Sequence, residues 1–409
     1  MKKIQIFFVL LIAIATCLSV SAEKLPKLFY SEDTSPLSGA RQTVESGREK
    51  KVSVDFSVIN PDGIRAKRII ADLPDKSVIL EMEKIVSGES RAYSWFGKIR
   101  GNDFSSVIFS VADGHMYGEI NDGENSYSVE PRGRSYRIVK EDSEKMIPIC
   151  ESPLIPPVVS SGKNNPSSRE SYRDSGKKID MLVLYTSAIK SKYKSKFKAL
   201  IRNYSDIANQ AYDNSDIDLK LNIIAMEPIY DIEAGELYNT SDALSYITGN
   251  KNIKSLRKKY NADLVCLVRK FKNKKNAACG TAWLMQSADK TFSPFAYSVV
   301  EVKKRTRRGY YCDKRTFAHE IGHNLGCAHD RTHASSSGIF DYSYGYKKSG
   351  KFSTIMSYGS QRITYFSTPL KEYKKWTIGK FDYESDGAYN AFTIEQTKNA
   401  AANFKQGGN

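Results

Sequence analysis

Long apolar runs are nearly absent from this 409-residue chain. One run, at 4–15, follows two lysines, but it is too short to span a bilayer comfortably, and no other segment approaches its length. This lack excludes a membrane-spanning helix. Residues 20–22 suit signal peptidase, so the sequence predicts a signal peptide over 1–22 and a secreted, extracellular protein. A lipoprotein signal at Cys17 is the alternative.

Internal repeats and nucleic-acid-binding motifs are also lacking, although the chain is strongly basic. The formal net charge is +16, and much of the excess lies between Lys251 and Arg315. Basic runs usually form solvated faces, and such a face attracts polyanions or acidic substrates. Because no nucleic-acid module accompanies the runs, we expect no nucleic-acid partner. A basic surface-binding protein with an incidental metal site is an alternative function.

Composition divides the rest of the chain into three parts, and its length allows two or three domains with full hydrophobic cores. Residues 23–149 contain short alternating segments separated by turn residues, which predicts a β-rich domain. Residues 150–178 are dense in Pro, Ser, Gly and charge, which predicts an exposed linker with a processing site. Residues 179–409 alternate strand and helix patterns, which predicts an α/β layer with a mostly parallel sheet. Long helices are expected there at about 188–214, 242–260 and 393–405.

Histidine is scarce, but three of the five histidines lie in "HEIGHNLGCAHD", residues 319–330. Helical positions four apart differ by about 40° around the axis, so His319 and His323 project from one face and can share an ion. Glu320 points about 100° away from His319, which suits a carboxylate that holds a water beside the ion. Gly326 lets the backbone turn and bring His329 round as a third ligand. Three nitrogen ligands leave one position open, as in catalytic zinc sites.

The extended pattern H-E-x-x-H-x-x-G-x-x-H, followed by Asp330, resembles the metzincin metallopeptidases. That clan also has a tight turn carrying a methionine beneath the metal, and Met356 in "STIMSYG" matches it. Asp330 is similar to the acid of the reprolysin (adamalysin)-like branch, which is buried and hydrogen-bonded near the methionine turn. Tyr358 departs from that branch. It resembles the tyrosine of the astacin and serralysin branches, which can ligate the metal, so it is a candidate metal or transition-state contact.

The resemblance covers about 179–405 and implies a fold. "CGTAWLM" and "YFSTP" look like the substrate-edge strand and the specificity-pocket wall of secreted bacterial peptidases of the peptidyl-Asp metalloendopeptidase type. The fold implied is an α/β zincin-like catalytic domain. It has a twisted, mostly parallel sheet with an antiparallel edge strand, an active-site helix, a methionine turn and a C-terminal helix. Substrate would lie extended along Thr281, Ala282 and Trp283 through backbone pairing.

The function implied by the resemblance is that of a zinc-dependent endopeptidase acting on proteins or peptides. One zinc ion would activate a water, with Glu320 as general base and acid. A monomer is expected, and nothing in the sequence supports a structural calcium site. A catalytically inactive, metalloprotease-like binding protein is the main alternative. Glu320 and Met356, both retained here, speak against it.

The β-rich part resembles the pro-regions of bacterial enzymes of this type in "YSWFGKIRGNDFSSVIFSVADGHMYGEI". Residues 23–149 are therefore predicted to be a propeptide that makes the protein a zymogen, and a permanently attached binding domain is the alternative. Cys150 is the odd thiol among the five cysteines that remain after export. As a thiolate it would occupy zinc's open position, as in the cysteine-switch latency of related families, although "IPICESP" departs from the usual switch motif.

Four cysteines remain for the metallopeptidase domain, and four cysteines allow three pairings. The favoured pairing joins Cys279 to Cys312, which would tie the edge strand to the start of the active-site helix. Cys266 lies in the middle of a predicted strand and is interpreted as a buried free thiol. For Cys327, a free thiol and a bridge both stay open.

Overall fold

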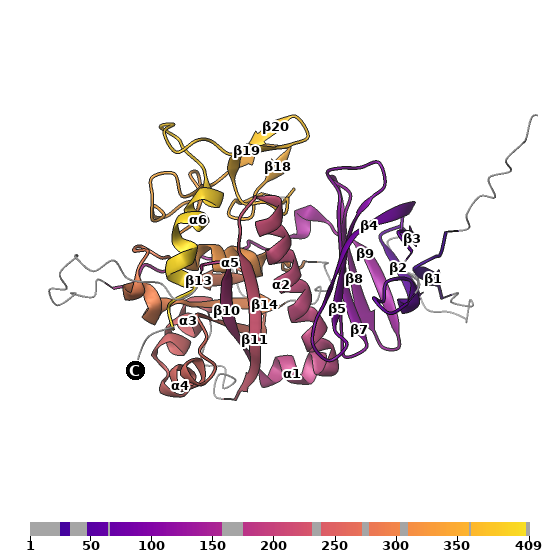
Figure 1. Ribbon diagram of the computed structural model, residues 1–409, viewed down its shortest axis with the longest axis horizontal. Coiled ribbons are helices and arrows are strands. Elements are labelled where there is room, and N and C mark those ends of the chain that lie inside the picture. The colour runs from indigo at the N-terminus through magenta and orange to yellow at the C-terminus, as the bar shows by residue number, and fades with distance from the viewer. Residues whose placement is uncertain are drawn as a thin grey trace, which may run out of the picture.

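The chain forms a nine-stranded antiparallel sheet and an α/β unit that lie side by side (Figure 1). The computed structural model describes residues 25–32, 47–63, 66–157, 175–230, 239–271, 278–302, 310–359 and 361–405. The predicted signal peptide lies outside the described residues, and so do residues 158–174 of the predicted linker. Within the described ranges, no helix combines the length and the apolar character needed to cross a membrane.

The N-terminal sheet has the order β1-β2-β9-β8-β7-β6-β5-β4-β3, and each strand is antiparallel to its neighbours. Alternating side chains bury one of its faces, where the rings of Trp95 and Phe109 lie 5.6 Å apart. The prediction of a β-rich region is confirmed. Its elements are β1 (Phe29–Ser31), β2 (Glu49–Val54), η1 (Phe56–Val58), β3 (Arg68–Asp72), β4 (Ser77–Ser87), β5 (Tyr93–Ile99), β6 (Ser106–Ala112), β7 (His115–Asn121), β8 (Ser126–Arg132), β9 (Ser135–Lys140) and η2 (Ser143–Lys145).

The α/β unit is built on a five-stranded sheet in the order β11-β10-β12-β14-β13. Its first four strands are parallel, and β13 runs antiparallel to β14 at the edge. Parallel strands are covered on both faces, which explains why their sequences are near-continuous apolar runs. The predicted mostly parallel sheet with an antiparallel edge strand is confirmed. The strands are β10 (Lys178–Thr186), β11 (Lys220–Ile229), β12 (Leu264–Lys270), β13 (Gly280–Ala282) and β14 (Tyr297–Val302).

Two helices predicted as continuous are each broken. Lys194 adopts a φ of +49°, which interrupts the helix predicted over 188–214. Asn250 is extended, and its side chain accepts the N–H groups of Asn252 and Ile253, so a new helix starts there. The C-terminal helix begins three residues before the predicted start and ends before the predicted end. The helices are α1 (Ser187–Tyr193), η3 (Lys194–Lys196), α2 (Phe197–Asn214), α3 (Thr240–Gly249), α4 (Lys251–Lys259), η4 (Lys290–Phe295), α5 (Thr316–Asn324) and α6 (Asn390–Ala401).

Helix α2 lies between the two sheets, as Figure 1 shows. Ile207 on this helix packs against Phe96 and Ile108 of the N-terminal sheet. The carboxylate of Asp206 accepts hydrogen bonds from Ser94 Oγ at 2.5 Å and Ser110 Oγ at 2.6 Å. The N-terminal sheet therefore docks on the α/β unit through an apolar contact and a buried polar one.

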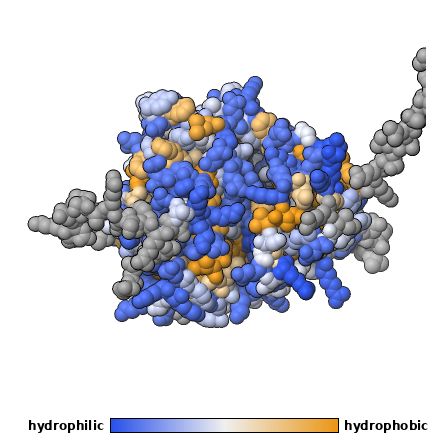
Figure 2. All heavy atoms as spheres, viewed as in Figure 1, coloured by the Kyte–Doolittle hydropathy of each residue, from blue (hydrophilic) through white to orange (hydrophobic). Residues whose placement is uncertain are grey.

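Short strand pairs and α6 complete the C-terminal region. The strands are β15 (Ala328–Asp330), β16 (Tyr344–Gly345), β17 (Lys347–Lys348), β18 (Phe352–Ser353), β19 (Thr368–Tyr373) and β20 (Trp376–Ile378). In the face seen in Figure 2, the surface is mostly hydrophilic, and apolar residues form small separate areas.

Candidate active site

Helix α5 and the turn after it bring three histidines together. His319 and His323 lie on α5 and are fully buried, and His329 lies on β15. Between them Gly326 adopts a φ of +88°, and a Cβ atom there would lie 2.5 Å from Ile339. The sharp turn therefore requires glycine at this position.

The three imidazoles point their Nε2 atoms at one another. His329 Nε2 lies 3.1 Å from the Nε2 atoms of both His319 and His323. The Nδ1 atoms of His319 and His323 face the backbone carbonyls of Ile355 and Cys327, at 2.8 and 2.7 Å. Because a carbonyl only accepts, each Nδ1 carries the proton and each Nε2 presents a lone pair. Lone pairs at this spacing fit a shared metal ion.

Cys150 adds a fourth donor to this cluster. Its sulfur and the histidine nitrogens all lie within 4.8 Å of one another, and all four residues are buried. Burial and the neighbouring imidazoles lower the pKa of His319 and His323 well below the usual value, so both rings are neutral and able to bind metal. Three imidazoles and one thiol form a donor set of the type that holds tetrahedral zinc.

Glu320 lies beside the cluster with one oxygen free. Its Oε2 atom is 3.4 Å from Cys150 Sγ, and its Oε1 atom is buried with no hydrogen-bond partner. Burial raises the pKa of Glu320 well above its usual value. A Cβ atom on Gly280 would lie 2.3 Å from Oε1, so the edge strand admits the carboxylate only because residue 280 is glycine. The sequence prediction missed this role, although glycine within a strand often indicates a close approach.

The turn carrying Met356 lies beneath α5. Ile355 in this turn provides the carbonyl that accepts from His319, and a Cβ atom on Gly322 would lie 2.5 Å from Met356 Sδ. Asp330 Oδ2 accepts the N–H of Tyr358 at 3.0 Å. Met356 thus lies against α5, and Asp330 is buried and hydrogen-bonded next to the same turn.

Residues 146–154 pass through the site beside the edge strand. The linker was predicted to be exposed from residue 150, but Cys150 is only 3% exposed, so the prediction was wrong at Cys150. The N–H groups of Glu151 and Leu154 donate to the carbonyls of Gly280 and Ala282, both at 3.0 Å. Leu154 also pairs with Trp283 in the parallel sense. The linker therefore takes the backbone groups that the sequence assigned to substrate.

Tyr358 contacts the linker as well. Its hydroxyl donates to the carbonyl oxygen of Cys150 at 2.6 Å. Its ring stacks on the ring of His333, at 4.8 Å between ring centres. The tyrosine hydroxyl therefore faces a backbone carbonyl next to the histidine cluster.

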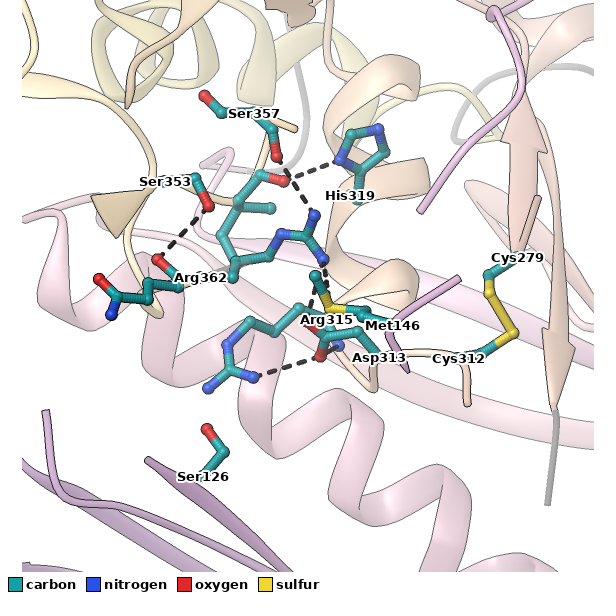
Figure 3. Close-up of polar contacts among 12 residues, drawn as sticks. Ser126, Met146, Cys279, Cys312, Asp313, Arg315, His319, Ser353, Ser357 and Arg362 are labelled. Carbon is teal, nitrogen blue, oxygen red and sulfur yellow. Dashed lines mark hydrogen bonds and ion pairs between the residues drawn. A yellow bond between two sulfur atoms is a disulfide. The ribbon is translucent and has the colours of Figure 1, made fainter. Parts of the chain in front are cut away.

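The cysteines divide as the favoured pairing predicted. Cys279 and Cys312 form a disulfide that joins the edge strand to the segment before α5, as Figure 3 shows. Cys150, Cys266 and Cys327 are free and buried, which answers the question left open for Cys327.

A buried ion network, which the sequence did not reveal, adjoins the N-terminal end of α5 (Figure 3). Asp313 accepts from Arg315 Nη1 at 3.2 Å and from Arg362 Nη1 at 2.9 Å. Burial alone would raise the pKa of Asp313, but the guanidinium groups of Arg315 and Arg362 hold this pKa below its usual value. Arg315 also pairs with Glu119 of β7. The basic run that ends at Arg315 was interpreted as a solvated face. Arg315 is buried instead, because the carboxylates of Asp313 and Glu119 neutralise its charge.

The part of the chain that matches a known protein family lies in the α/β unit. Residues 175–367 match the family model Reprolysin_5, described as Metallo-peptidase family M12. A peptidyl-Asp metalloendopeptidase of Pseudomonas aeruginosa is 31% identical over 196 residues, which are 44% of this chain and 32% of that protein. The chain thus spans about a third of that relative's length. Peptidyl-Asp metalloendopeptidases of Xanthomonas campestris and Stenotrophomonas maltophilia are 24% and 23% identical, over 96% and 94% of this chain and 97% and 90% of theirs.

These matches confirm the predicted resemblance to the metzincin metallopeptidases. The chain is a metzincin-like relative of the peptidyl-Asp metalloendopeptidases. They also bear out the predicted enzyme class, a zinc metalloendopeptidase, at the level of the family.

Proposed function

We propose that this chain is a secreted zinc endopeptidase that is made as a latent precursor and cleaves proteins or peptides. The observation that carries the proposal is the convergence of three neutral imidazoles on one point, with a carboxylate beside them. In this proposal His319, His323 and His329 hold the ion. When bound by three such ligands, zinc lowers the pKa of a water to about 7 and polarises a carbonyl.

Glu320 is the proposed general base and acid. Its buried carboxylate has an oxygen without a protein partner, which leaves it able to accept a hydrogen bond from a water. The proton that it takes from the water would pass to the leaving amine, which must be protonated to depart. Gly280 keeps the carboxylate at its place, because any side chain there would displace it.

The edge strand and Tyr358 are the proposed binding groups for the peptide. Linker residues already hydrogen-bond to Gly280 and Ala282, so these carbonyls are able to bind an extended backbone. The Tyr358 hydroxyl donates to a backbone carbonyl in the same segment. With a substrate in place of the linker, this hydroxyl would donate to the oxygen that becomes negatively charged.

Latency is proposed to come from residues 23–150. The sheet at 29–140 docks on α2, and its continuation carries Cys150 to the histidine cluster. A thiolate there would occupy the position that a water needs. Cleavage in the predicted linker would then release the segment from the edge strand.

The test is hydrolysis by the processed enzyme, recovered from the culture medium, of casein and of a fluorogenic peptide. We expect Glu320→Ala to bind zinc stoichiometrically but to lose at least about 1000-fold in activity. Glu384→Ala, at a carboxylate distant in sequence, is the matched control and should keep full activity. Removal of the ion by a chelator should also abolish hydrolysis, and zinc should restore it.

Two results would contradict the proposal. Full activity in Glu320→Ala removes the assigned base. Zinc binding without any hydrolysis by the unaltered enzyme favours the alternative of an inactive binding protein. N-terminal sequencing of the secreted protein tests the predicted processing within 150–178.

A further inference from the structure

Three basic residues and one acid form a buried cluster at the N-terminal end of the active-site helix. We call Lys314, Arg315, Arg362 and Asp313 the arginine cluster. Each is less than 10% exposed. Asp313 binds both guanidinium groups, and Arg315 Nε also donates to Thr364 Oγ1 at 3.0 Å. The two arginines are therefore held in position by groups of the metallopeptidase unit itself.

The charge of this cluster is not balanced within the metallopeptidase unit. It carries three cations and one carboxylate, and the further groups come from β7 of the N-terminal sheet. Both terminal nitrogens of the Arg315 guanidinium group, Nη1 and Nη2, donate to the carboxylate of Glu119. Lys314 Nζ donates to the carbonyl of Gly118 at 2.7 Å. Removal of residues 23–149 would leave the cluster with two positive charges in excess, and these charges would then be available to a new anionic partner.

The arginine cluster is connected directly to the elements that hold the histidines. The carbonyl of Arg315 accepts the N–H of His319 at 2.9 Å, one helical turn away. Arg362 Nη2 donates to the carbonyl of Ser357, the residue after Met356, at 3.3 Å. Figure 3 shows Arg315 and Arg362 on the same side of α5 as Asp313, below His319. The cluster is thus bonded to α5 and to the turn that carries Met356, the two elements next to the histidines.

Two features show that the cluster has room for a ligand. Arg362 Nε is buried and has no hydrogen-bond partner, which is a costly state for a guanidinium donor. A cavity of about 240 Å³ adjoins the cluster and is lined by Glu119, Ser126, Arg315 and Arg362 among others. Met146, four residues before the predicted linker, contacts Arg362, with its sulfur 3.6 Å from Nη1. Glu119 and Met146 would both leave with the N-terminal segment.

We propose that the arginine cluster is the receptor for a carboxylate side chain of the substrate, and that Glu119 occupies this receptor in the full chain. The inference rests on the proposed endopeptidase function and assigns residues to its specificity. A guanidinium fork binds a carboxylate through two parallel hydrogen bonds, the arrangement that Glu119 makes with Arg315. An amide of the same shape provides one acceptor and no charge, so a buried cationic site rejects it. The names of the relatives, peptidyl-Asp metalloendopeptidases, agree with an acidic preference.

The test uses two fluorogenic peptides that are identical except for one aspartate, which is replaced by asparagine in the second. For the processed enzyme we expect kcat/KM to be about 10- to 100-fold higher for the aspartate peptide, the range of one or two charge-assisted hydrogen bonds. Arg315→Gln and Arg362→Gln should each lower kcat/KM for the aspartate peptide about 10-fold or more, and should lower the ratio of the aspartate value to the asparagine value. Lys371→Gln removes a surface positive charge that pairs with Asp216, and it should change neither value.

A binding measurement separates this inference from the proposed chemistry. Fluorescence anisotropy of the labelled peptides with the processed Glu320→Ala protein reports affinity without turnover, and it should show the same preference for aspartate. Equal binding and equal cleavage of the two peptides by protein with intact Arg315 and Arg362 would overturn the receptor. Failure of the enzyme to hydrolyse either peptide, with the binding preference intact, would sink the proposed function and not the receptor.

Whether each variant folds is checked by its melting temperature and by whether the precursor is cleaved to the processed enzyme. Should the glutamine variants fail to fold, Arg315→Lys and Arg362→Lys keep the charge but remove the fork. Each is expected to reduce the aspartate-to-asparagine ratio about threefold or more. A ratio that stays at the unaltered value in folded lysine variants also overturns the assignment.

Discussion

Cys150 Sγ lies 3.4 Å from Glu320 Oε2, although 170 residues separate the two in sequence. The same sulfur is 3.6 Å from His323 Nε2. A thiol here shares the space that a metal-bound water needs next to its base. The contact joins the N-terminal segment to the centre of the site and gives the latency proposal its first test.

The first prediction concerns Cys150→Ala in the full, uncleaved chain. Loss of the sulfur should open the fourth donor position, and peptide hydrolysis by the precursor should rise at least about 10-fold over the unaltered precursor. Initial rates are measured before processing, which gel electrophoresis monitors. Cys266→Ala, at another buried free thiol, is the control and should keep the precursor latent. Equal latency in both variants would refute the switch.

The second prediction concerns Gly280→Ala. A methyl group would meet Glu320 Oε1 at 2.3 Å and push the carboxylate away from its place. A displacement of about 1 Å typically costs on the order of 100-fold in rate, so kcat should fall by about that factor with zinc content unchanged. Gly249→Ala, which ends α3 and has nothing within 4 Å of the new methyl, should be neutral. Normal kcat in Gly280→Ala would show that the edge strand tolerates the methyl.

The third prediction concerns the disulfide. Cys279 and Cys312 close a loop with a sequence separation of 33, and a loop of this size is expected to stabilise the fold by about 3–4 kcal/mol. Cys279→Ser/Cys312→Ser should lower the free energy of unfolding by that amount, measured by urea denaturation in the Glu320→Ala background to prevent self-digestion. Reducing agent should reproduce the loss in the parent and have no effect on the double variant. An unchanged midpoint would mean that the bridge adds no stability.

The fourth prediction concerns pH and Asp263. Burial raises the pKa of this carboxyl from 3.8 to about 7, and its Oδ1 atom has no partner. Because the folded pKa is the higher one, the stabilising contribution is complete below about pH 4 and is lost as pH rises to about 7. At roughly 1.4 kcal/mol per pKa unit, the loss is on the order of 4 kcal/mol.

Asp263→Asn removes the titration and keeps an acceptor for the N–H of Asp180. The free energy of unfolding of the variant, relative to the parent, should therefore increase steadily between pH 4 and pH 7. Taking the difference between the two proteins cancels the carboxyls that titrate elsewhere. A difference that is constant over this range contradicts the raised pKa.

The chain's local chemistry was readable without the fold. The spacing of His319, Glu320 and His323 depends only on the 3.6-residue period of a helix, and Gly326 only on backbone freedom. The apolar runs at 179–186 and 264–270 indicated strands covered on both faces for the same local reason. The disulfide between Cys279 and Cys312 was the favoured one of three possible pairings, because it would join the edge strand to the start of the active-site helix.

The sequence pattern did not predict where two helices break or which groups approach each other closely. Lys194 takes a positive φ, and Asn250 caps a new helix, where the periodic pattern alone predicts continuity. Gly280 matters because of a carboxylate 40 residues later, which no local pattern in the edge strand reveals. These features depend on packing partners, and packing partners are not adjacent in sequence.

What the sequence by itself determined was the set of groups able to hold a metal and the kind of sheet behind them, because both depend on repeats within single elements. Only the tertiary structure decided that Cys150 lies against Glu320, and that Glu119 neutralises Arg315 beside the active-site helix. Those contacts join segments more than 160 residues apart. These contacts form when the two sheets pack and bury both apolar surface and charged groups, because a buried charge needs a partner. A short stretch of sequence does not show which distant segment will provide that partner.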